Sequence, residues 1–292
     1  MGSKTAYIFS GQGFAFSDLE DLRNISFPLD VQSSFNRVFG RALEPLDELT
    51  PAIYRQNEVS AAILLTSTLS WMELSLQKPD FFAGFSVGQY IALYAAGALS
   101  RSDLIMLVFK RCKYMNEAAK IVPGAMVSVL GLGHDEVLEL ANANNVWISN
   151  DNAPGNLTVA GEAEKLKVFC KEAKRHGAYK LQELPTSGAW HCPCMKPAVK
   201  GLVLAVSEVS WKPTAIPVIA NISVSEFEID NAVDLLSSHL IKTVRWRETI
   251  QYLYSLGTVK FVEISHFDLL SKMGPFITRR AAWKSIKSSK VR

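Results

Sequence analysis

The sequence has few cysteines, little net charge and no long apolar run. Its cysteines are only Cys112, Cys170, Cys192 and Cys194 in 292 residues, which excludes a disulfide-built scaffold and predicts reduced thiols in a cytoplasmic protein. The formal net charge of +3 is too small to indicate nucleic-acid binding. No apolar stretch reaches the roughly 20 residues of a membrane helix, and the N-terminus lacks a basic-then-apolar leader. We therefore expect a globular protein that binds neither nucleic acid nor membrane.

A metal centre is not expected either. His191, Cys192 and Cys194 lie close together in the sequence, but no second pair of ligands occurs at the spacing of a zinc site. Hydrophobic residues make up 48% of the chain, which is enough to build one large domain or two modest ones.

A serine between two glycines is the most informative stretch. The apolar residues 81–83 predict a buried strand, the sequence Gly-Phe-Ser-Val-Gly follows at 84–88, and residues 89–96 predict a helix that ends at Gly97. A strand, a sharp turn with Ser86 at its tip and a helix together form the context of a nucleophile elbow. The alternative is a glycine-rich connection in which Ser86 only caps the helix.

Two further segments indicate a ligand site. Residues 5–9 predict a first strand, and the turn Ser10-Gly11-Gln12-Gly13 follows it, where ligands bind in α/β sheets. A helix is predicted from Ser100 to about Lys120, with Arg111 inside its apolar stripe. A guanidinium in that position needs an anion or a route to water. An internal ion pair, a side chain that reaches the solvent, and a substrate carboxylate all remain open.

The pattern of predicted elements changes at residue 125. Strand, helix, strand, strand, helix and strand follow one another over residues 125–184, which is the order of a ferredoxin-like subdomain. After it come a loop at 187–193 that carries His191, a short buried strand that ends at Asn221, two amphipathic helices and a strand at 259–264. A lone loop histidine is commonly a surface group. The basic tail, residues 279–292, is expected to be solvated and mobile.

Four motifs occur in an order that is typical of one family. They are Phe9-Ser10-Gly11-Gln12-Gly13, Gly84-Phe85-Ser86-Val87-Gly88, Arg111 followed by Met115-Asn116, and Gly188-Ala189-Trp190-His191. From about Tyr7 to about Leu270 the chain resembles the malonyl-CoA:acyl-carrier-protein transacylases and the related acyltransferases of polyketide synthases. The resemblance implies an α/β fold: an α/β-hydrolase-like body with a parallel sheet from residues 1–124 and 186–292, and an inserted ferredoxin-like subdomain from residues 125–185.

The resemblance also implies a role for each matching residue. Ser86 would be the acyl-accepting nucleophile, His191 its general base, Gln12 and Val87 the backbone donors of the oxyanion hole, Arg111 the ligand of the malonyl carboxylate, His239 the backbone carbonyl that orients the histidine, and Phe85 and Trp190 the specificity residues. A missing acidic triad member is therefore expected. The implied substrates are a CoA thioester and the phosphopantetheine thiol of an acyl carrier protein. We expect a monomer with no bound cofactor, and the charge of the basic tail suits an acidic carrier.

The chain departs from the family pattern beside the site. Phe85 replaces the usual histidine, Gln89 a glutamate, Ser10 a proline, and Ser265-His266-Phe267 a glycine-proline-glycine turn. We expect altered substrate choice, and an unusual extender unit such as carrier-bound hydroxymalonyl or aminomalonyl is one alternative. Two other functions stay open: an acyl hydrolase that clears carrier proteins, and an inactive carrier-docking protein.

Overall fold

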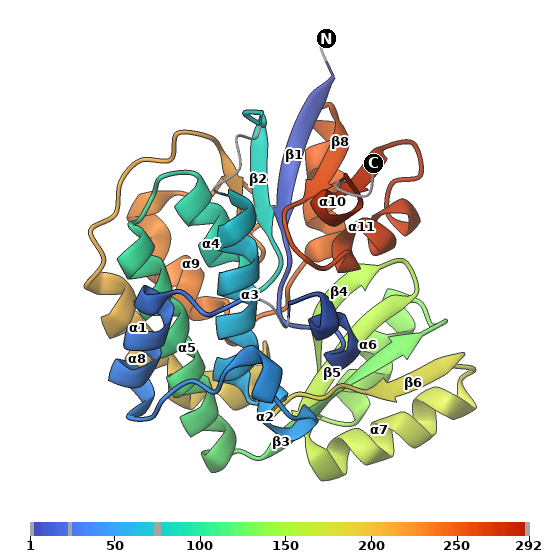
Figure 1. Cartoon of the computed structure of the whole chain (residues 1–292). Helices are drawn as coiled ribbons and strands as arrows, with labels where there is room; N and C mark the ends of the chain where they lie inside the picture. The colour runs from blue at the N-terminus through green and yellow to red at the C-terminus, as the bar shows by residue number, and fades with distance from the viewer. Residues whose placement is uncertain (1–2, 23–24, 73–76, 290–292) are drawn as a thin grey trace.

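The computed structural model of the chain describes residues 3–22, 25–72 and 77–289. Within these residues, a parallel sheet of five strands has the order β7-β2-β1-β8-β9 (Figure 1). The strands are β1 (Lys4–Phe9), β2 (Phe81–Gly84), β7 (Val218–Ile219), β8 (Thr258–Glu263) and β9 (Ala282–Ser285). Because β1 and β2 are neighbours, the loop after β1 and the turn after β2 meet at one edge of the sheet.

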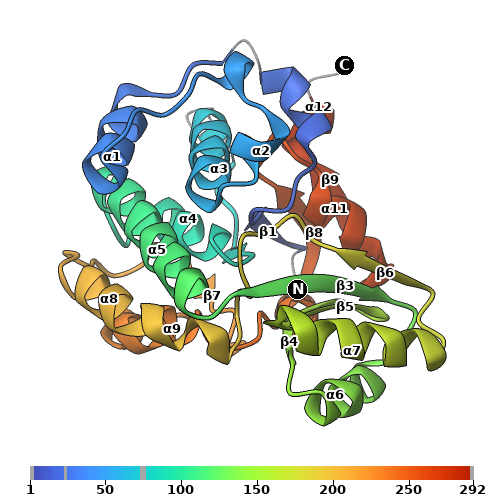
Figure 2. The same ribbon diagram turned by 90° about the horizontal axis from the view of Figure 1, so that it is seen from below.

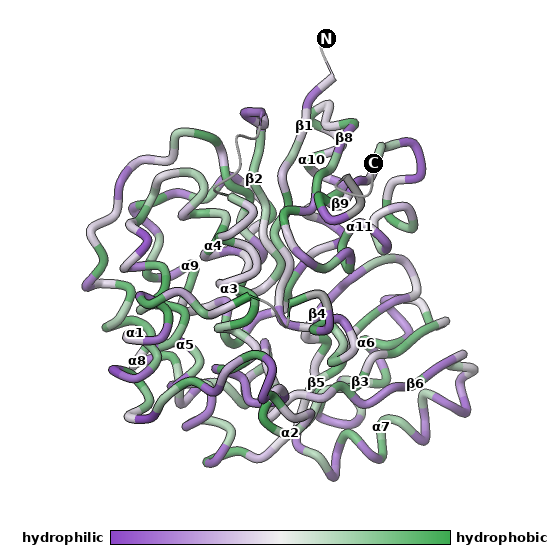
Figure 3. The backbone as a smooth tube through the Cα atoms, viewed as in Figure 1, coloured by the Kyte–Doolittle hydropathy of each residue, from purple (hydrophilic) through white to green (hydrophobic). Residues whose placement is uncertain are grey.

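Side chains of the central strands alternate between two cores. Tyr7 and Phe9 pack into the larger core, whereas Ala6 and Ile8 pack into the core on the opposite face. Helices cover both faces: α3 (Asn57–Met72), α4 (Gly88–Ala95) and α5 (Arg101–Ile121) contribute to the first core, and α10 (Trp246–Ser255) to the second. Figure 3 shows apolar residues along β1 and β2. A sheet buried on both faces explains why these strands are continuous apolar runs.

A second, antiparallel sheet has the order β4-β5-β3-β6. Its elements are β3 (Gly124–Leu130), α6 (His134–Ala143), β4 (Trp147–Ala153), β5 (Asn156–Glu162), α7 (Ala163–Arg175) and β6 (Lys180–Glu183). Both helices pack on one face and share a separate core with the strands (Figure 2). This order confirms the predicted ferredoxin-like fold. The limits of the subdomain at residues 125 and 185 stay a prediction.

The remaining helices surround these two sheets. They are α1 (Leu29–Phe39), α2 (Pro51–Tyr54), α8 (Lys196–Ser207), α9 (Ala232–Ser238), α11 (Leu269–Met273), α12 (Ile286–Ser289) and the 3-10 turns η1 (Phe16–Leu22), η2 (Leu46–Glu48), η3 (Pro193–Met195), η4 (Ile229–Asn231) and η5 (Gly274–Phe276). Among the described residues, no helix has both the length and the apolar character needed to span a membrane.

The prediction of a mobile C-terminal tail is wrong for the residues of the tail that the structure describes. Residues 282–285 form β9, which pairs in parallel with β8. Trp283 stacks on Phe261 with ring centroids 4.3 Å apart and 10° between the planes. Lys284 is exposed while Ser285 and Ile286 are buried, so the cations alternate with inward side chains. The basic composition of the tail hid this strand pattern. Residues 290–292 of the predicted tail lie outside the described residues.

Candidate active site

Ser86 lies at the tip of a strained turn between β2 and α4. Its φ angle of 54° is in the left-handed region, which a serine occupies only at a cost. A Cβ on Gly84 would lie 1.9 Å from the carbonyl oxygen of Gly88, and a Cβ on Gly88 would lie 2.3 Å from that of Phe9. No other residue type fits at these two positions. The turn therefore has the geometry of the predicted nucleophile elbow.

His191 contacts the serine directly. Ser86 Oγ is 2.7 Å from His191 Nε2, and His191 Nδ1 is 2.7 Å from the backbone oxygen of His239. A carbonyl oxygen can only accept, so Nδ1 carries the proton and Nε2 is free to accept the hydroxyl hydrogen. His191 is 3% exposed, which rules out the reading of a surface loop histidine. The structure thus brings three of the predicted residues into one hydrogen-bonded series.

The environment keeps the imidazole neutral. Burial, and to a smaller extent the nearby Arg111 cation, lower the pKa of His191 to about 3, although the hydrogen bond to the His239 carbonyl opposes both effects. A neutral imidazole with a free Nε2 lone pair is the form that a general base needs.

Arg111 reaches the same point from α5. Its side chain is 1% exposed, its Nη2 lies 3.3 Å from Ser86 Oγ, and its guanidinium lies 5.8 Å from the centre of the Tyr90 ring. Nη1 is buried with no hydrogen-bond partner, and no carboxylate in the described residues forms an ion pair with Arg111. Of the three alternatives, an internal ion pair and a route to solvent are thereby excluded. A buried, half-satisfied guanidinium beside the hydroxyl is a receptor for an anion.

Asn221, whose role the sequence did not reveal, supports the elbow. The Ser86 N–H donates to Asn221 Oδ1 at 3.0 Å, and Asn221 Nδ2 donates to the Gly84 carbonyl at 2.7 Å. The Asn221 N–H in turn donates to Gln89 Oε1 at 3.0 Å. The available signal was a polar residue at the end of a buried strand, since such positions face the active edge of a parallel sheet. Gln89, a departure from the family pattern, supplies only an acceptor here.

The loop after β1 packs against the elbow. A Cβ on Gly11 would lie 2.8 Å from the carbonyl oxygen of Phe85, so the close approach requires glycine. Within the described part of the chain, neither the Gln12 N–H nor the Val87 N–H has a protein acceptor. Val87 also precedes the first turn of α4, where backbone N–H groups and the helix dipole favour negative charge.

Gln12 and Ser86 line a cavity of about 280 Å³ between the two sheets. Ser86, Arg111 and His191 form its base, and Phe85 and Trp190 contribute aromatic walls. The antiparallel sheet contributes a polar wall: Ser128, Asn150, Asn152, Asn156 and Thr158. A cleft between the body and the inserted subdomain is where a substrate was expected.

The family departures have structural consequences. Phe85 packs edge-on against Trp246 with ring centroids 5.6 Å apart, and the Trp246 indole N–H is buried with no acceptor. Phe267 stacks on Phe14 at 3.8 Å, so the altered late turn fills a wall of the core with an aromatic pair. Ser10 donates its hydroxyl hydrogen to Glu263, a bond that proline could not make.

Comparison with known proteins decides the family. The sequence profile of the acyl transferase domain matches residues 59–279. The chain belongs to the acyl transferase domain family. The match includes the elbow, Arg111 and His191, and acyl transfer is therefore the reaction class of this chain.

Individual relatives agree with this family. The chain is 31% identical over 295 residues to the malonyl CoA-acyl carrier protein transacylase of Bacillus subtilis, with 95% of this chain and 92% of the relative covered. It is also 31% identical over 285 residues to the polyketide biosynthesis protein ThaF of Burkholderia thailandensis, covering 94% of this chain and 24% of that longer protein.

Solved structures agree over nearly the whole chain. An acyl-carrier-protein S-malonyltransferase from Burkholderia pseudomallei gives a TM-score of 0.86 at 26% identity, covering 97% of this chain and 96% of the other. A malonyl-transacylase solved in complex with its type II polyketide synthase acyl carrier protein gives 0.83 at 28% identity, covering 97% and 95%. The acyltransferase fold therefore includes both sheets, as the predicted fold class requires.

Proposed function

We propose that this acyltransferase moves a malonyl group from the thioester of coenzyme A, through an ester on Ser86, to the phosphopantetheine thiol of an acyl carrier protein. The observation that carries the malonyl assignment is the buried Arg111, whose Nη2 lies 3.3 Å from Ser86 Oγ while its Nη1 has no partner. An acyl group with a free carboxylate satisfies both nitrogens. A neutral acyl chain leaves the guanidinium buried and unpaired.

The first half-reaction follows from these contacts. His191 Nε2 takes the proton of the Ser86 hydroxyl as Oγ attacks the thioester carbonyl. The oxygen of that carbonyl becomes negative and accepts hydrogen bonds from the backbone N–H groups of Gln12 and Val87. The His239 carbonyl holds the imidazole and stabilises the imidazolium that forms. The thiol of coenzyme A leaves with the proton from His191, and malonyl-Ser86 remains.

The second half-reaction is the reverse with a different thiol. The carrier's phosphopantetheine thiol gives its proton to His191 and attacks the ester, and Ser86 leaves with that proton. Every atom transferred comes from the two substrates, so the reaction needs no bound cofactor. We assign the active unit to a monomer, and the four free cysteines fit a reducing cytoplasm.

Two parts of the site set the selectivity for the acyl group: Arg111 at its carboxylate, and the aromatic rings beside Ser86. The Arg111–carboxylate contact, at about 1.5–3 kcal/mol, favours malonyl over acetyl by about tenfold or more. Trp190 and Phe85 occupy the space beside Ser86 with rigid rings. A Cβ on Gly188 would meet the Trp190 ring at 2.6 Å, so this glycine is needed for the indole to lie where it does. Branched extender units are therefore expected to fit poorly.

The test is the intact mass of the protein after exposure to acyl-CoAs. Incubation with malonyl-CoA should add one malonyl group to the wild type and none to Ser86→Ala. Arg111→Ala should reduce the ratio of malonyl to acetyl loading by about tenfold or more, because the acetyl group never used the guanidinium. A hydroxymalonyl or aminomalonyl carrier in the same panel tests the unusual extenders.

Adding a carrier protein completes the assay. Transfer is supported if the carrier gains the malonyl mass and the enzyme loses it. Free malonate with an unloaded carrier would instead establish hydrolysis, and no mass on Ser86 with any acyl donor would leave only a docking role.

A further inference from the structure

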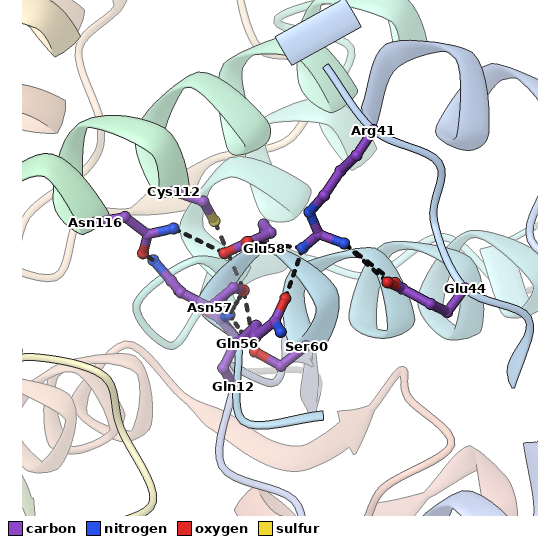
Figure 4. Close-up of polar contacts among 9 residues, drawn as sticks. All are labelled: Gln12, Arg41, Glu44, Gln56, Asn57, Glu58, Ser60, Cys112 and Asn116. Atoms are coloured by element: carbon purple, nitrogen blue, oxygen red, sulfur yellow. Dashed lines mark hydrogen bonds and ion pairs between the residues drawn. The ribbon is translucent and has the colours of Figure 1, made fainter. Parts of the chain in front are cut away.

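A buried polar network lies beside the active site, and the reaction described above does not use it (Figure 4). It begins at the side chain of Gln12, whose Nε2 donates to the backbone oxygen of Asn57 at 2.6 Å, to Asn57 Oδ1 at 3.0 Å and to Ser60 Oγ at 2.6 Å. A primary amide has only two N–H bonds, so three acceptors share them and fix the direction of the carboxamide. The Gln12 side chain is therefore fixed at its end.

The network continues from Asn57 to a buried carboxylate. Asn57 Nδ2 donates to Asn116 Oδ1 at 3.2 Å, and Asn116 Nδ2 donates to Glu58 Oε2 at 2.7 Å. Asn57 and Glu58 are 5% and 9% exposed. Arg41 pairs with the other carboxylate oxygen of Glu58 at 3.0 Å.

The network residues lie on different structural elements, and this placement shows what the network connects. Asn57 and Glu58 begin α3, and Asn116 lies on α5, five residues after Arg111. The network thus ties the loop of Gln12 to the helix that carries the carboxylate-binding arginine. A buried carboxylate is costly unless it is paired and hydrogen-bonded, and a broken pair leaves an uncompensated charge. Each residue of the network therefore depends on its neighbour to satisfy its hydrogen bonds or its charge.

We propose that Glu58, Asn116 and Asn57 are positioning residues that hold Gln12 so that its backbone N–H points at the developing oxyanion. This rests on the proposed role of that N–H group in the reaction of Ser86. The loop of Gln12 is an irregular connection after β1, and although Glu263 holds Ser10 at its start, the side-chain hydrogen bonds of Gln12 itself go to Asn57 and Ser60. A displacement of about 1 Å at a reacting centre costs on the order of a hundredfold in rate, so anchoring the side chain controls the donor.

The test compares rates of Ser86 acylation in a matched set of variants. Asn116→Leu keeps the number and branching of the side-chain heavy atoms and removes both hydrogen bonds, and Gln12→Ala keeps the backbone donor and removes its anchor. Each should lower the single-turnover acylation rate by about tenfold or more, with the Kd of malonyl-CoA unchanged within about twofold. Glu44→Gln is the control, because Glu44 touches only Arg41 at the half-exposed end of the network and should leave the rate unchanged.

The double variant tests the connection itself. If Asn116 acts through Gln12, Asn116→Leu should cause no further loss in the Gln12→Ala background. Fully additive losses, or a normal rate in Asn116→Leu, would overturn the proposal. If Asn116→Leu does not fold, Asn116→Ala removes the same two hydrogen bonds without adding volume and should lower the rate in the same way; a normal rate there would overturn the proposal.

A fluorophosphonate probe separates this inference from the malonyl assignment. Ser86 Oγ displaces fluoride from phosphorus, His191 takes the hydroxyl proton, and the phosphoryl oxygen occupies the oxyanion position. The labelling rate should fall in parallel with the acylation rate in Asn116→Leu, whereas a network that only stabilises the fold would lower the melting temperature and leave labelling unchanged. A wild type that reacts with the probe but not with malonyl-CoA would refute the proposed substrate and not the positioning role.

Discussion

His191 shows how one residue acquires its chemistry from its surroundings. A histidine in solution is half-protonated near neutral pH, whereas here burial and the Arg111 cation hold the pKa of His191 at about 3. The backbone carbonyl of His239 accepts the Nδ1 hydrogen bond that a carboxylate accepts in enzymes with a Ser-His-Asp triad. A carboxylate would raise the pKa of the imidazole, so the neutral carbonyl is consistent with a base that stays unprotonated.

The depressed pKa predicts an unusual pH dependence. The rate of Ser86 acylation should stay flat from about pH 8 to about pH 5, without the loss near pH 6.5 that an ordinary histidine base gives. Single-turnover rates across this range are the measurement. A loss of rate with a midpoint between about pH 6 and 7 would show that the imidazole titrates normally.

The same shift affects stability. The unfolded chain binds a proton on His191 below about pH 6.5 that the folded chain does not bind, so this contribution to stability is fully present above pH 6.5 and is lost as the pH falls toward 3. Wild type should therefore lose more unfolding free energy between pH 7.5 and pH 5 than His191→Gln does. His239 is present in both proteins, and burial, which is the largest cause of its lowered pKa, does not depend on His191.

Phe85 leaves a buried donor unpaired. Among the described residues the indole N–H of Trp246 has no acceptor, and the ring of Phe85 packs edge-on against the indole ring. Phe85→His would offer a ring nitrogen there, whereas Phe85→Leu would not. We expect Phe85→His to be more stable than Phe85→Leu by about 1–3 kcal/mol in urea unfolding, the usual cost of an unsatisfied buried group. Equal stabilities would mean that the indole finds a partner without the histidine.

At the element scale, Glu263 connects β8 to the loop after β1 and to α11. Its carboxylate accepts hydrogen bonds from the Ser10 hydroxyl and from the backbone N–H groups of Leu270 and Ser271, at 3.1 and 2.7 Å. It is 0% exposed, and burial raises its pKa while these bonds oppose the rise. Leu270 lines the cavity, so one carboxylate sets both the loop that precedes Gln12 and a wall of the site.

Because Glu263 accepts hydrogen bonds from three donors, replacing it should lower the stability more than removing one of the donors. Glu263→Leu removes the acceptor of three groups, each of which costs about 1–3 kcal/mol when buried and unpaired. Ser10→Ala removes one donor and should cost about 1 kcal/mol. Urea unfolding of both variants is the measurement. If Glu263→Leu were as stable as Ser10→Ala or more stable, the carboxylate would not connect β8, the loop after β1 and α11 as described.

At the scale of the whole molecule, the candidate site is shared between two sheets, and the last strand completes the edge of one of them. Ser86 follows strand β2 of the parallel sheet, and the antiparallel sheet supplies the opposite polar wall of the cavity. The basic C-terminal segment is part of the body, because β9 pairs with β8 and the Trp283 indole N–H donates to the Thr278 carbonyl at 3.2 Å.

Deleting residues 281–292 should therefore destabilise the whole body. The deletion removes an edge strand and the aromatic stack on Phe261, with an expected loss of at least about 2 kcal/mol in unfolding free energy. Lys284→Ser, which changes an exposed cation and keeps the strand, is the control and should stay within about 0.5 kcal/mol of wild type. A deletion as stable as wild type would restore the expectation of a detached tail. Carrier binding by this segment is thus better tested by charge substitutions.

The sequence alone determined those elements that depend on interactions between residues close together in the chain. The two glycines around Ser86, the apolar run before it and the helix after it specify the elbow, because steric clash and hydrophobic period act over a few residues. The βαββαβ order and the place of Arg111 in an apolar stripe follow from the same short-range rules. Boundaries follow less well from local rules: the buried strand predicted to end at Asn221 is only Val218–Ile219.

Only the tertiary structure decided which distant groups meet. Ser86 and His191 contact each other although they are 105 positions apart in the sequence. That Arg111 has no acid partner in the described part of the chain, that Asn221 supports the elbow and that Glu58 connects to Gln12 are facts of packing between separate segments. No pattern in the sequence gives such distances, because hydrogen bonds and desolvation depend on where whole elements come to rest. The sequence thus determines which side chains are available for the candidate site, and the fold sets their charge states and their alignment.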